Sequence, residues 1–253
     1  MKNIETNQDR TKEYLKIFNR EKTMRLLVQN QDPIIFDVGA NNGSSVKQFK
    51  SWWKGAKIHC FEPQEECWHD LDMLAKEYNS KTIFINKCAA GNNPTNDAIF
   101  YSHNITTGQS GFNKINLESK DSIFLDKLYG KKDSNSFQNY CNSINHERHI
   151  EIIRLDDYMN LNEINKVDIL KIDTQGYEPE VLDGFGKRLS KIDVVITELM
   201  FYDYYERSLS FADIEKYLIP AGFQLYDISH ISKNPMNGRT DWVDVIYINE
   251  KIR

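Results

Sequence analysis

The chain has 253 residues, of which 40% are hydrophobic and 27% are charged, and its formal net charge is -5. This length and composition allow one large domain with a sizeable core, and they exclude a chain too polar to fold. The acidic balance excludes a general basic surface, so we expect no nucleic-acid partner.

The N-terminal segment, residues 1–30, is predicted to be helical, with a helical pattern at about 8–29. Its apolar residues are spaced so that they share one broad face. They are Tyr14, Leu15, Ile17, Phe18, Met24, Leu26 and Leu27.

The beginning of the chain has no apolar core of the signal-peptide type, and no apolar run approaches the roughly 18 residues of a membrane span. The four cysteines, Cys60, Cys67, Cys88 and Cys141, form no C-x-x-C pair, so neither a zinc knuckle nor a thioredoxin-type motif is indicated. We therefore expect a reduced, cytoplasmic protein without a membrane span.

Residues 31–253 are predicted to form a single domain in which short apolar strands alternate with amphipathic helices. Strands are expected at 34–39, 57–63, 82–90, 98–102, 167–173, 192–201, 223–229 and 242–249, and helices at 46–53, 64–78, 174–189 (after a turn) and 210–222. This alternation predicts a Rossmann-like α/β fold, with a mainly parallel sheet and helices on both faces. Two strands after the last helix predict an antiparallel C-terminal edge.

A polar insertion interrupts the alternation at about 102–149. A structureless loop of that length is uncommon in a compact domain and is often functional, although a surface excursion is the plainer alternative. Its histidines, His103, His146 and His149, are expected to be solvated loop residues.

The most informative string is DVGANNG, which ends an apolar strand and precedes a helix. Gly39 and Gly43 allow a sharp turn and the close approach of a ligand, while Asn41 and Asn42 separate them. The spacing is not the G-x-G-x-x-G of dinucleotide-binding proteins. A carboxylate at Asp37 would repel a pyrophosphate but suits the ammonium group of S-adenosylmethionine (SAM).

A second acid, Glu62, ends the next strand and is followed by Pro63. An acid at this position can accept hydrogen bonds from both ribose hydroxyls of a nucleotide-like cofactor. Cys88 and Ala89 are expected to end the third strand, where they would flank an adenine. The alternative for these acids and for the strand end is ordinary capping, surface exposure or core packing.

These strings resemble the FkbM family of O-methyltransferases, whose members begin with D-V-G-A-N-x-G followed by F-E-P. The resemblance continues in LDDY at 155–158 and in KIDTQGYE at 171–178, which is followed by EVL and Gly184. It covers about residues 33–200 and implies a class I methyltransferase fold, SAM as the methyl donor, and transfer to a hydroxyl of a small molecule, secondary metabolite or glycan. The family carries a stretch similar to Gly108-Gln109-Ser110, which implies that Ser110 closes over the cofactor.

Asp173 and Glu178 are the candidate catalytic bases, because removal of a proton from an alcohol assists its attack on a methyl group. Asp173, at the end of its strand, is also expected to contact the cofactor. His103 is a weaker candidate base. Aromatic residues at 202, 204 and 205 are expected either to wall an acceptor pocket or to pack as loop residues.

Several alternatives stay open. A Mg²⁺ ion between Asp173, Glu198 and Asp203 is one, although no metal is expected. N-methylation, a non-catalytic SAM-binding protein and a nucleotide-cofactor oxidoreductase are others. No feature of the sequence specifies the acceptor or an oligomeric state.

Overall fold

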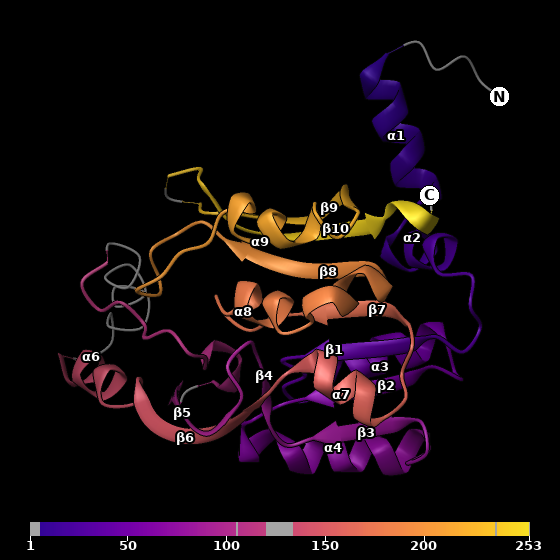
Figure 1. Ribbon diagram of the computed structural model, residues 1–253. Helices are drawn as coiled ribbons and strands as arrows, with labels where there is room; N and C mark the ends of the chain where they lie inside the picture. Colours follow the sequence, from indigo (N-terminus) through magenta and orange to yellow (C-terminus); the bar gives the residue numbers. More distant parts are fainter. Residues whose placement is uncertain (1–5, 105, 120–133, 236, 253) are drawn as a thin grey trace.

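A seven-stranded sheet forms the centre of the computed structural model, which describes residues 6–104, 106–119, 134–235 and 237–252 (Figure 1). Its strand order is β3-β2-β1-β7-β8-β10-β9. The strands are β1 (Ile34–Val38), β2 (Lys57–Phe61), β3 (Ile83–Asn86), β7 (Val167–Ile172), β8 (Ile192–Met200), β9 (Phe223–Lys233) and β10 (Thr240–Asn249). The first five run parallel, and β10 is antiparallel to β8 and β9. The predicted fold class and its antiparallel C-terminal edge are confirmed.

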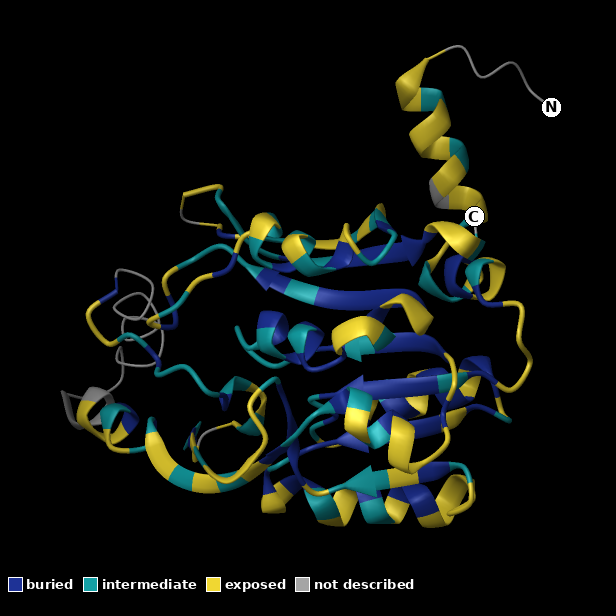
Figure 2. Cartoon of the chain, viewed as in Figure 1, coloured by how far each residue is buried: buried dark blue, intermediate teal, exposed yellow. Residues whose placement is uncertain are grey.

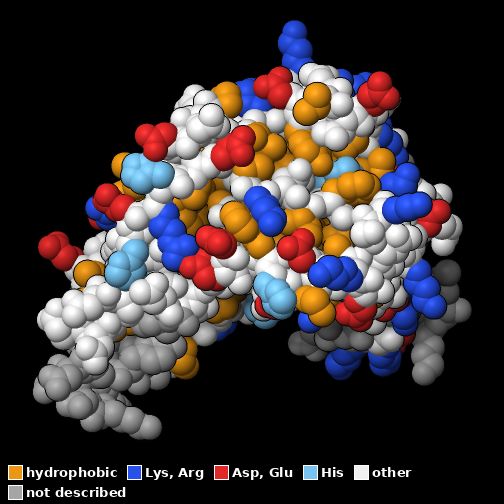
Figure 3. All heavy atoms as spheres, turned by 90° about the horizontal axis from the view of Figure 1, so that it is seen from below, with side chains coloured by type: hydrophobic (Ala, Val, Ile, Leu, Met, Phe, Trp, Pro, Cys, Tyr) orange, Lys and Arg blue, Asp and Glu red, His pale blue; other side chains and the backbone are white. Residues whose placement is uncertain are grey.

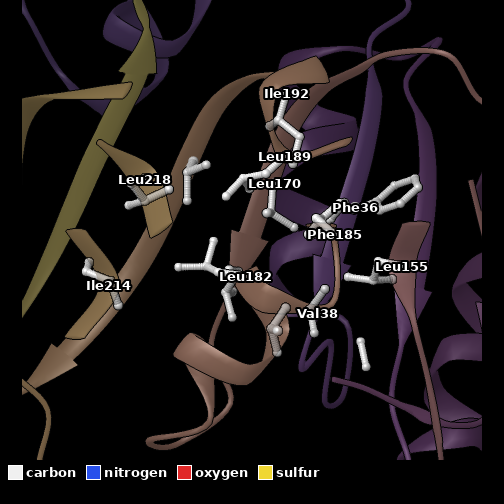
Figure 4. Close-up of a cluster of buried hydrophobic side chains, with 14 of the residues drawn as sticks. Phe36, Val38, Leu155, Leu170, Leu182, Phe185, Leu189, Ile192, Ile214 and Leu218 are labelled. Atoms are coloured by element: carbon white, nitrogen blue, oxygen red, sulfur yellow. The ribbon is translucent and has the colours of Figure 1, made fainter. Parts of the chain in front are cut away.

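Helices cover both faces of this sheet because successive residues of each buried strand point to opposite sides. Ile35 packs with α3 (Ser44–Trp52) and α4 (Glu65–Tyr78) on one face. Phe36 packs on the other face with α7 (Leu155–Leu161), α8 (Glu178–Asp183) and α9 (Phe211–Leu218). Figure 4 shows this second cluster, in which Phe36 and Val38 lie close to Phe185 and Leu155. The near-continuous apolar strands therefore supply two cores.

The N-terminal segment is helical as predicted, and it contains two helices. α1 (Asn7–Ile17) and α2 (Arg20–Leu27) are separated at Phe18 and Asn19. The Asn19 side chain accepts a hydrogen bond from the Lys22 amide at 2.8 Å and so begins α2.

The apolar residues of this segment differ in burial. Met24 is fully buried and Leu27 packs against the core, whereas Tyr14, Ile17 and Leu26 are large exposed apolar residues. The side chain of Leu15 lies outside the described residues. α1 extends away from the sheet and is largely exposed (Figure 2).

A second, three-stranded sheet is present, and two strand boundaries predicted in this part of the chain, the end of the strand at 82–90 and the beginning of the strand at 98–102, are wrong. β3 ends at Asn86, and Ala89–Ala90 forms a separate strand, β4, which pairs with β6 (His146–Ile153). β5 (Thr95–Ser102) is antiparallel to β6, so the order is β4-β6-β5. Cys88 therefore lies between two strands rather than at the end of the third. β6 is not among the predicted strands, because its sequence is largely polar and hydropathy detects buried strands best.

The predicted insertion has regular structure in its described part. It contains η1 (Thr107–Gln109), α6 (Ser134–Cys141) and the beginning of β6, while 120–133 lie outside the described residues. Of the helix predicted at 174–189, only Glu178–Asp183 is α-helical, and a 3₁₀ helix, η3 (Gly186–Lys191), begins near its predicted end. Another 3₁₀ helix, η4 (Glu250–Ile252), follows β10.

The described helices include none that is both long enough and apolar enough to cross a membrane. Acidic and basic side chains are interspersed on the face of the molecule shown in Figure 3. The chain has 37 acidic and 32 basic residues, so this mixing fits its modest net charge.

Candidate active site

A cavity of about 240 Å³ lies at the carboxyl ends of β1, β2 and β7, and we call it the strand-end cavity. Open parallel sheets bind their ligands at this edge. The residues predicted to contact a cofactor that line it are Gly39, Asn41, Asn42, Glu62, Pro63, Ala89, Ser110 and Asp173. Four other predicted site residues, Asp37, Gly43, Cys88 and Glu178, do not line it.

The glycines of the β1–α3 turn allow close packing within the protein. Both have a left-handed backbone, with φ of 78° at Gly39 and 81° at Gly43. A Cβ on Gly39 would lie 1.9 Å from the backbone oxygen of Asp173, and one on Gly43 would lie 2.3 Å from Leu74 Cδ1. Both glycines therefore have a packing reason, against the end of β7 and against α4, and because Gly39 also lines the cavity, close approach of a ligand there stays a prediction.

Asp37 lies beneath the cavity and is fully buried. Its Oδ2 accepts a hydrogen bond from Ser45 Oγ, and its Oδ1 is 3.3 Å from Lys171 Nζ. Its charge is thus compensated inside the protein, and Asp37 is not part of the cavity wall.

Lys171 is a functional candidate that the sequence reasoning missed, although it belongs to the KID string. Its Nζ lies 3.3 Å from Asp37 and 3.5 Å from Asp173, and it donates to the Gly39 carbonyl at 3.3 Å. Burial opposes its charge, but the two carboxylates raise its pKa above the ordinary value, so it stays protonated. Lys171 therefore joins the ends of β1 and β7.

Glu62 is 2% exposed and lies in the cavity wall. Its Oε2 accepts from the Asn41 amide at 2.8 Å, and its Oε1 accepts from the Gln64 amide at 2.9 Å and from Gln64 Nε2 at 3.2 Å. Burial raises its pKa, although these hydrogen bonds oppose the shift. Because each carboxylate oxygen accepts about two hydrogen bonds, Oε2 retains one acceptor position.

The beginning of the insertion closes one side of the cavity. Thr107 Oγ1 donates to Asn41 Oδ1 at 3.1 Å, and Gln64 Nε2 donates to the Thr107 carbonyl at 3.1 Å. Ser110 lines the cavity, and its Oγ accepts from the His103 amide at 3.2 Å. Sequence reasoning missed Thr107 and Gln64, since neither belongs to a pattern with a known chemical role.

Aromatic residues line the same side. Phe100 and Phe112 line the cavity, with ring centroids 5.4 Å apart, and Phe112 contacts Tyr177 at 4.1 Å. Ala89 also lines the cavity, whereas Cys88 packs in the core, where burial raises its pKa to about 12.

Asp173 is the most accessible carboxylate of the cavity, with 39% of its side chain exposed. Its Oδ1 accepts from Gln175 Nε2 at 2.8 Å. Gln175 has a left-handed backbone with φ of 55°, and its Oε1 accepts from Tyr205 Oη at 2.9 Å. Asp173 is thus held in place while remaining open to a ligand.

Glu178 holds the turn after β7. It is 2% exposed, and its Oε1 accepts from the amide and the hydroxyl of Thr174 at 2.8 and 3.0 Å. Burial raises its pKa to about 7. Since its side chain lies outside the cavity wall, the geometry favours a positioning role over the predicted role as a base.

Two further expectations have mixed outcomes. His103 is 4% exposed, so the prediction of a solvated residue is wrong, and burial lowers its pKa to about 4. His146 and His149 are exposed as expected, but they lie in β6 rather than in a loop. Tyr204 and Tyr205 are buried in a small cluster with Ile115, which corresponds to the packing alternative. Among the described residues, no group of three or more His, Cys, Asp or Glu side chains is arranged to hold a metal ion.

The strand order and the cavity at the carboxyl ends define a class I methyltransferase fold. Residues 37–225 match the family described as "Methyltransferase FkbM domain". The chain therefore belongs to the FkbM methyltransferase family, as the sequence motifs predicted.

A curated relative, the 2-O-methyltransferase NoeI of Sinorhizobium fredii (strain NBRC 101917 / NGR234), is 23% identical over 187 residues, which cover 72% of this chain and 70% of the relative. A solved structure of methyltransferase FkbM from Methylobacillus flagellatus KT has a TM-score of 0.50 and 16% identity. The match covers 86% of this chain but 44% of that chain. Magnesium protoporphyrin IX methyltransferase from Synechocystis PCC 6803, solved with bound SAM, has a TM-score of 0.45 and 11% identity, over 91% of this chain and 77% of its own.

Proposed function

We propose that this protein transfers a methyl group from SAM to a hydroxyl oxygen of a sugar, glycan or secondary metabolite. The observation that carries the proposal is the charge of the strand-end cavity. Glu62 and Asp173 contribute carboxylates to its wall, and no Lys, Arg or His side chain is among the described residues that line it. Such a wall suits a ligand with a sulfonium and an ammonium group and disfavours a pyrophosphate.

The residues present fit SAM in three respects. Glu62 Oε2 has an acceptor position for a ribose hydroxyl. Phe100, Phe112 and Ala89 offer apolar surface for an adenine. Asp173 offers an exposed carboxylate to the cationic part, in place of the buried Asp37. SAM, when bound, supplies a methyl group on a positively charged sulfur.

Asp173 would accept the proton of the acceptor hydroxyl as the O–CH₃ bond forms and the S–CH₃ bond breaks. Gln175 and Lys171 hold its carboxylate from two sides, which orients it without covering it. Oxygen as the acceptor atom is supported by the relative named as a 2-O-methyltransferase.

Ligand-dependent stability tests the proposal directly. SAM and S-adenosylhomocysteine should raise the melting temperature, because a ligand at about 100 times its Kd stabilises the folded state by roughly 2.7 kcal/mol. NAD, as the matched control, should cause no shift. Stabilisation by NAD, or none by saturating SAM, would overturn the assignment.

A further inference from the structure

Tyr205 lies in the loop after β8 and contacts the side chain that holds the proposed base. It is 3% exposed and packs in a cluster with Ile115 and Tyr204. Its Oη lies 2.9 Å from Gln175 Oε1, and Gln175 Nε2 donates to Asp173 Oδ1 at 2.8 Å. Tyr205 is therefore joined to Asp173 through one intervening side chain.

The direction of these hydrogen bonds follows from what each group can donate. An ionised carboxylate only accepts, so Gln175 presents its amide nitrogen to Asp173 and its amide oxygen to Tyr205. Burial raises the pKa of Tyr205 well above its ordinary value, so the hydroxyl keeps its proton and is the donor. The Tyr205 hydroxyl thus fixes which way the Gln175 amide faces.

The same hydroxyl is bound to the insertion. It also lies 2.9 Å from the carbonyl oxygen of Gln109, the last residue of η1. A phenol has a single O–H, so Gln109 and Gln175 share one donor. Since η1 closes one side of the strand-end cavity through Thr107, Tyr205 links that wall to the side chain that holds Asp173.

Backbone pairing holds Tyr205 itself in place. The residues on either side of it pair with 114–116 through backbone hydrogen bonds of 2.8 and 2.9 Å, and Tyr205 forms an antiparallel bridge with Ile115. The Gln175 carbonyl accepts from Asn113 Nδ2 at 3.3 Å. The insertion therefore contacts the turn after β7 directly, through Asn113, and also through Tyr205.

We propose that Tyr205 is a positioning residue of the methyl-transfer site. Through Gln175 it directs the Asp173 carboxylate, and it makes that direction depend on the packing of the insertion. Tyr205 does not line the strand-end cavity, so it acts without touching a ligand. This role rests on the proposed function and deepens it.

Tyr205→Phe tests the role because it removes the hydroxyl and keeps the ring. In proton–nitrogen NMR spectra of the ligand-free protein, the side-chain amide signal of Gln175, identified by its absence in Gln175→Met, should shift. SAM affinity, measured by calorimetry, should fall about three- to tenfold, because a buried acceptor loses its donor. Tyr204→Phe is the matched control, since Tyr204 Oη lies 3.4 Å from Tyr140 Oη in the same cluster, and it should change neither.

A double variant separates positioning from general packing. Gln175→Met leaves the aromatic cluster intact and should weaken SAM binding at least as much as Tyr205→Phe. Adding Tyr205→Phe to Gln175→Met should weaken it no further, because the hydroxyl acts through that amide. A merely structural role of Tyr205 would give additive losses instead.

The outcomes distinguish this role from the proposed function. An unshifted Gln175 signal, additive losses in the double variant, or an equal loss in Tyr204→Phe would each overturn the role of Tyr205 alone. Unchanged SAM affinity in Gln175→Met would do the same. Failure of the wild type to bind SAM would overturn the proposed function, and with it the role that rests on it.

Discussion

The carboxylates around the site differ in how far the protein itself occupies their oxygens. Asp37 is fully buried beside Lys171 and Ser45, and Glu178 is buried against Thr174. Glu62 accepts three hydrogen bonds, one from Asn41 of the β1–α3 turn and two from Gln64, and keeps one acceptor position. Only Asp173, of these four, has a substantially exposed side chain. Asp37 and Glu178 therefore stabilise turns of the protein, whereas Glu62 and Asp173 are available to a ligand.

Asp173→Asn should weaken SAM binding, because the carboxylate also faces the cationic part of SAM, and it should slow the transfer step even at saturating SAM. An amide can replace the hydrogen bond with Gln175 but cannot take up a proton, so loss of a general base should cost on the order of 10²–10⁴ in rate. Single-turnover rates at saturating SAM measure this effect. A rate within about threefold of the wild type would show that positioning alone carries the chemistry.

Glu62→Gln should weaken SAM binding by roughly one to two decades, because charge-assisted hydrogen bonds contribute about 1.5–3 kcal/mol. Its amide group would also face a main-chain donor of Asn41 or Gln64, so the loop should become less ordered. Calorimetric titration with SAM gives the affinity. Unchanged affinity would restrict Glu62 to a structural role in the loop.

The β1–α3 turn is the element that brings the site together. Its backbone at Gly39 lies against the backbone of Asp173, its Asn41 amide donates to Glu62, and its Asn41 side chain accepts from Thr107. Three segments that are far apart in the sequence therefore converge on one turn. The packing of this turn controls the shape of the strand-end cavity.

Gly39→Ala should strongly destabilise the protein. The left-handed backbone alone costs an alanine roughly 1–2 kcal/mol, and the new Cβ would also lie 1.9 Å from the Asp173 carbonyl oxygen. Gly238→Ala is the matched control, because Gly238 has φ of +74° but no atom within 4 Å of the added Cβ. Denaturant unfolding should show a clearly larger loss for Gly39→Ala, and equal losses would contradict the packing argument.

At the scale of the whole molecule, the two cores fix the sheet edge at which all these groups meet. The strands are buried on both faces, whereas α1 and the outer surface of β9 are largely exposed (Figure 2). Burial of charged groups at this edge also makes the folding free energy depend on pH. Glu178 illustrates the effect because its pKa in the folded state, about 7, exceeds its ordinary value of 4.5.

The free energy of unfolding should fall as the pH rises from about 4.5 to 7. In that range the folded state keeps the proton of Glu178 and the unfolded state has lost it, so the slope from this group is at most about 1.4 kcal/mol per pH unit. Glu178→Gln should lack this contribution, and its stability relative to the wild type should grow up to pH 7 and then level off. Melting temperatures across this range test it, with the exposed Glu163→Gln as the control. Parallel curves for wild type and Glu178→Gln would contradict the prediction.

The strand–helix alternation, the antiparallel edge and the family could be predicted from the sequence alone, because short apolar strands and the DVGANNG and KIDTQGYE strings are local signals. It also indicated that Glu62 and Asp173 lie at strand ends on a common edge, which the structure confirms. Local patterns sufficed here because the carboxyl ends of parallel strands meet at one edge.

Which side chains line the strand-end cavity could not be predicted from local patterns and follows from the tertiary structure. It buried Asp37 against Lys171, removed Glu178 and Cys88 from the wall, and brought Thr107 onto Asn41. It also formed the polar strand β6. The physical reason is that burial and the partners of a charged or polar group depend on contacts between distant segments, which periodicity within one segment does not record.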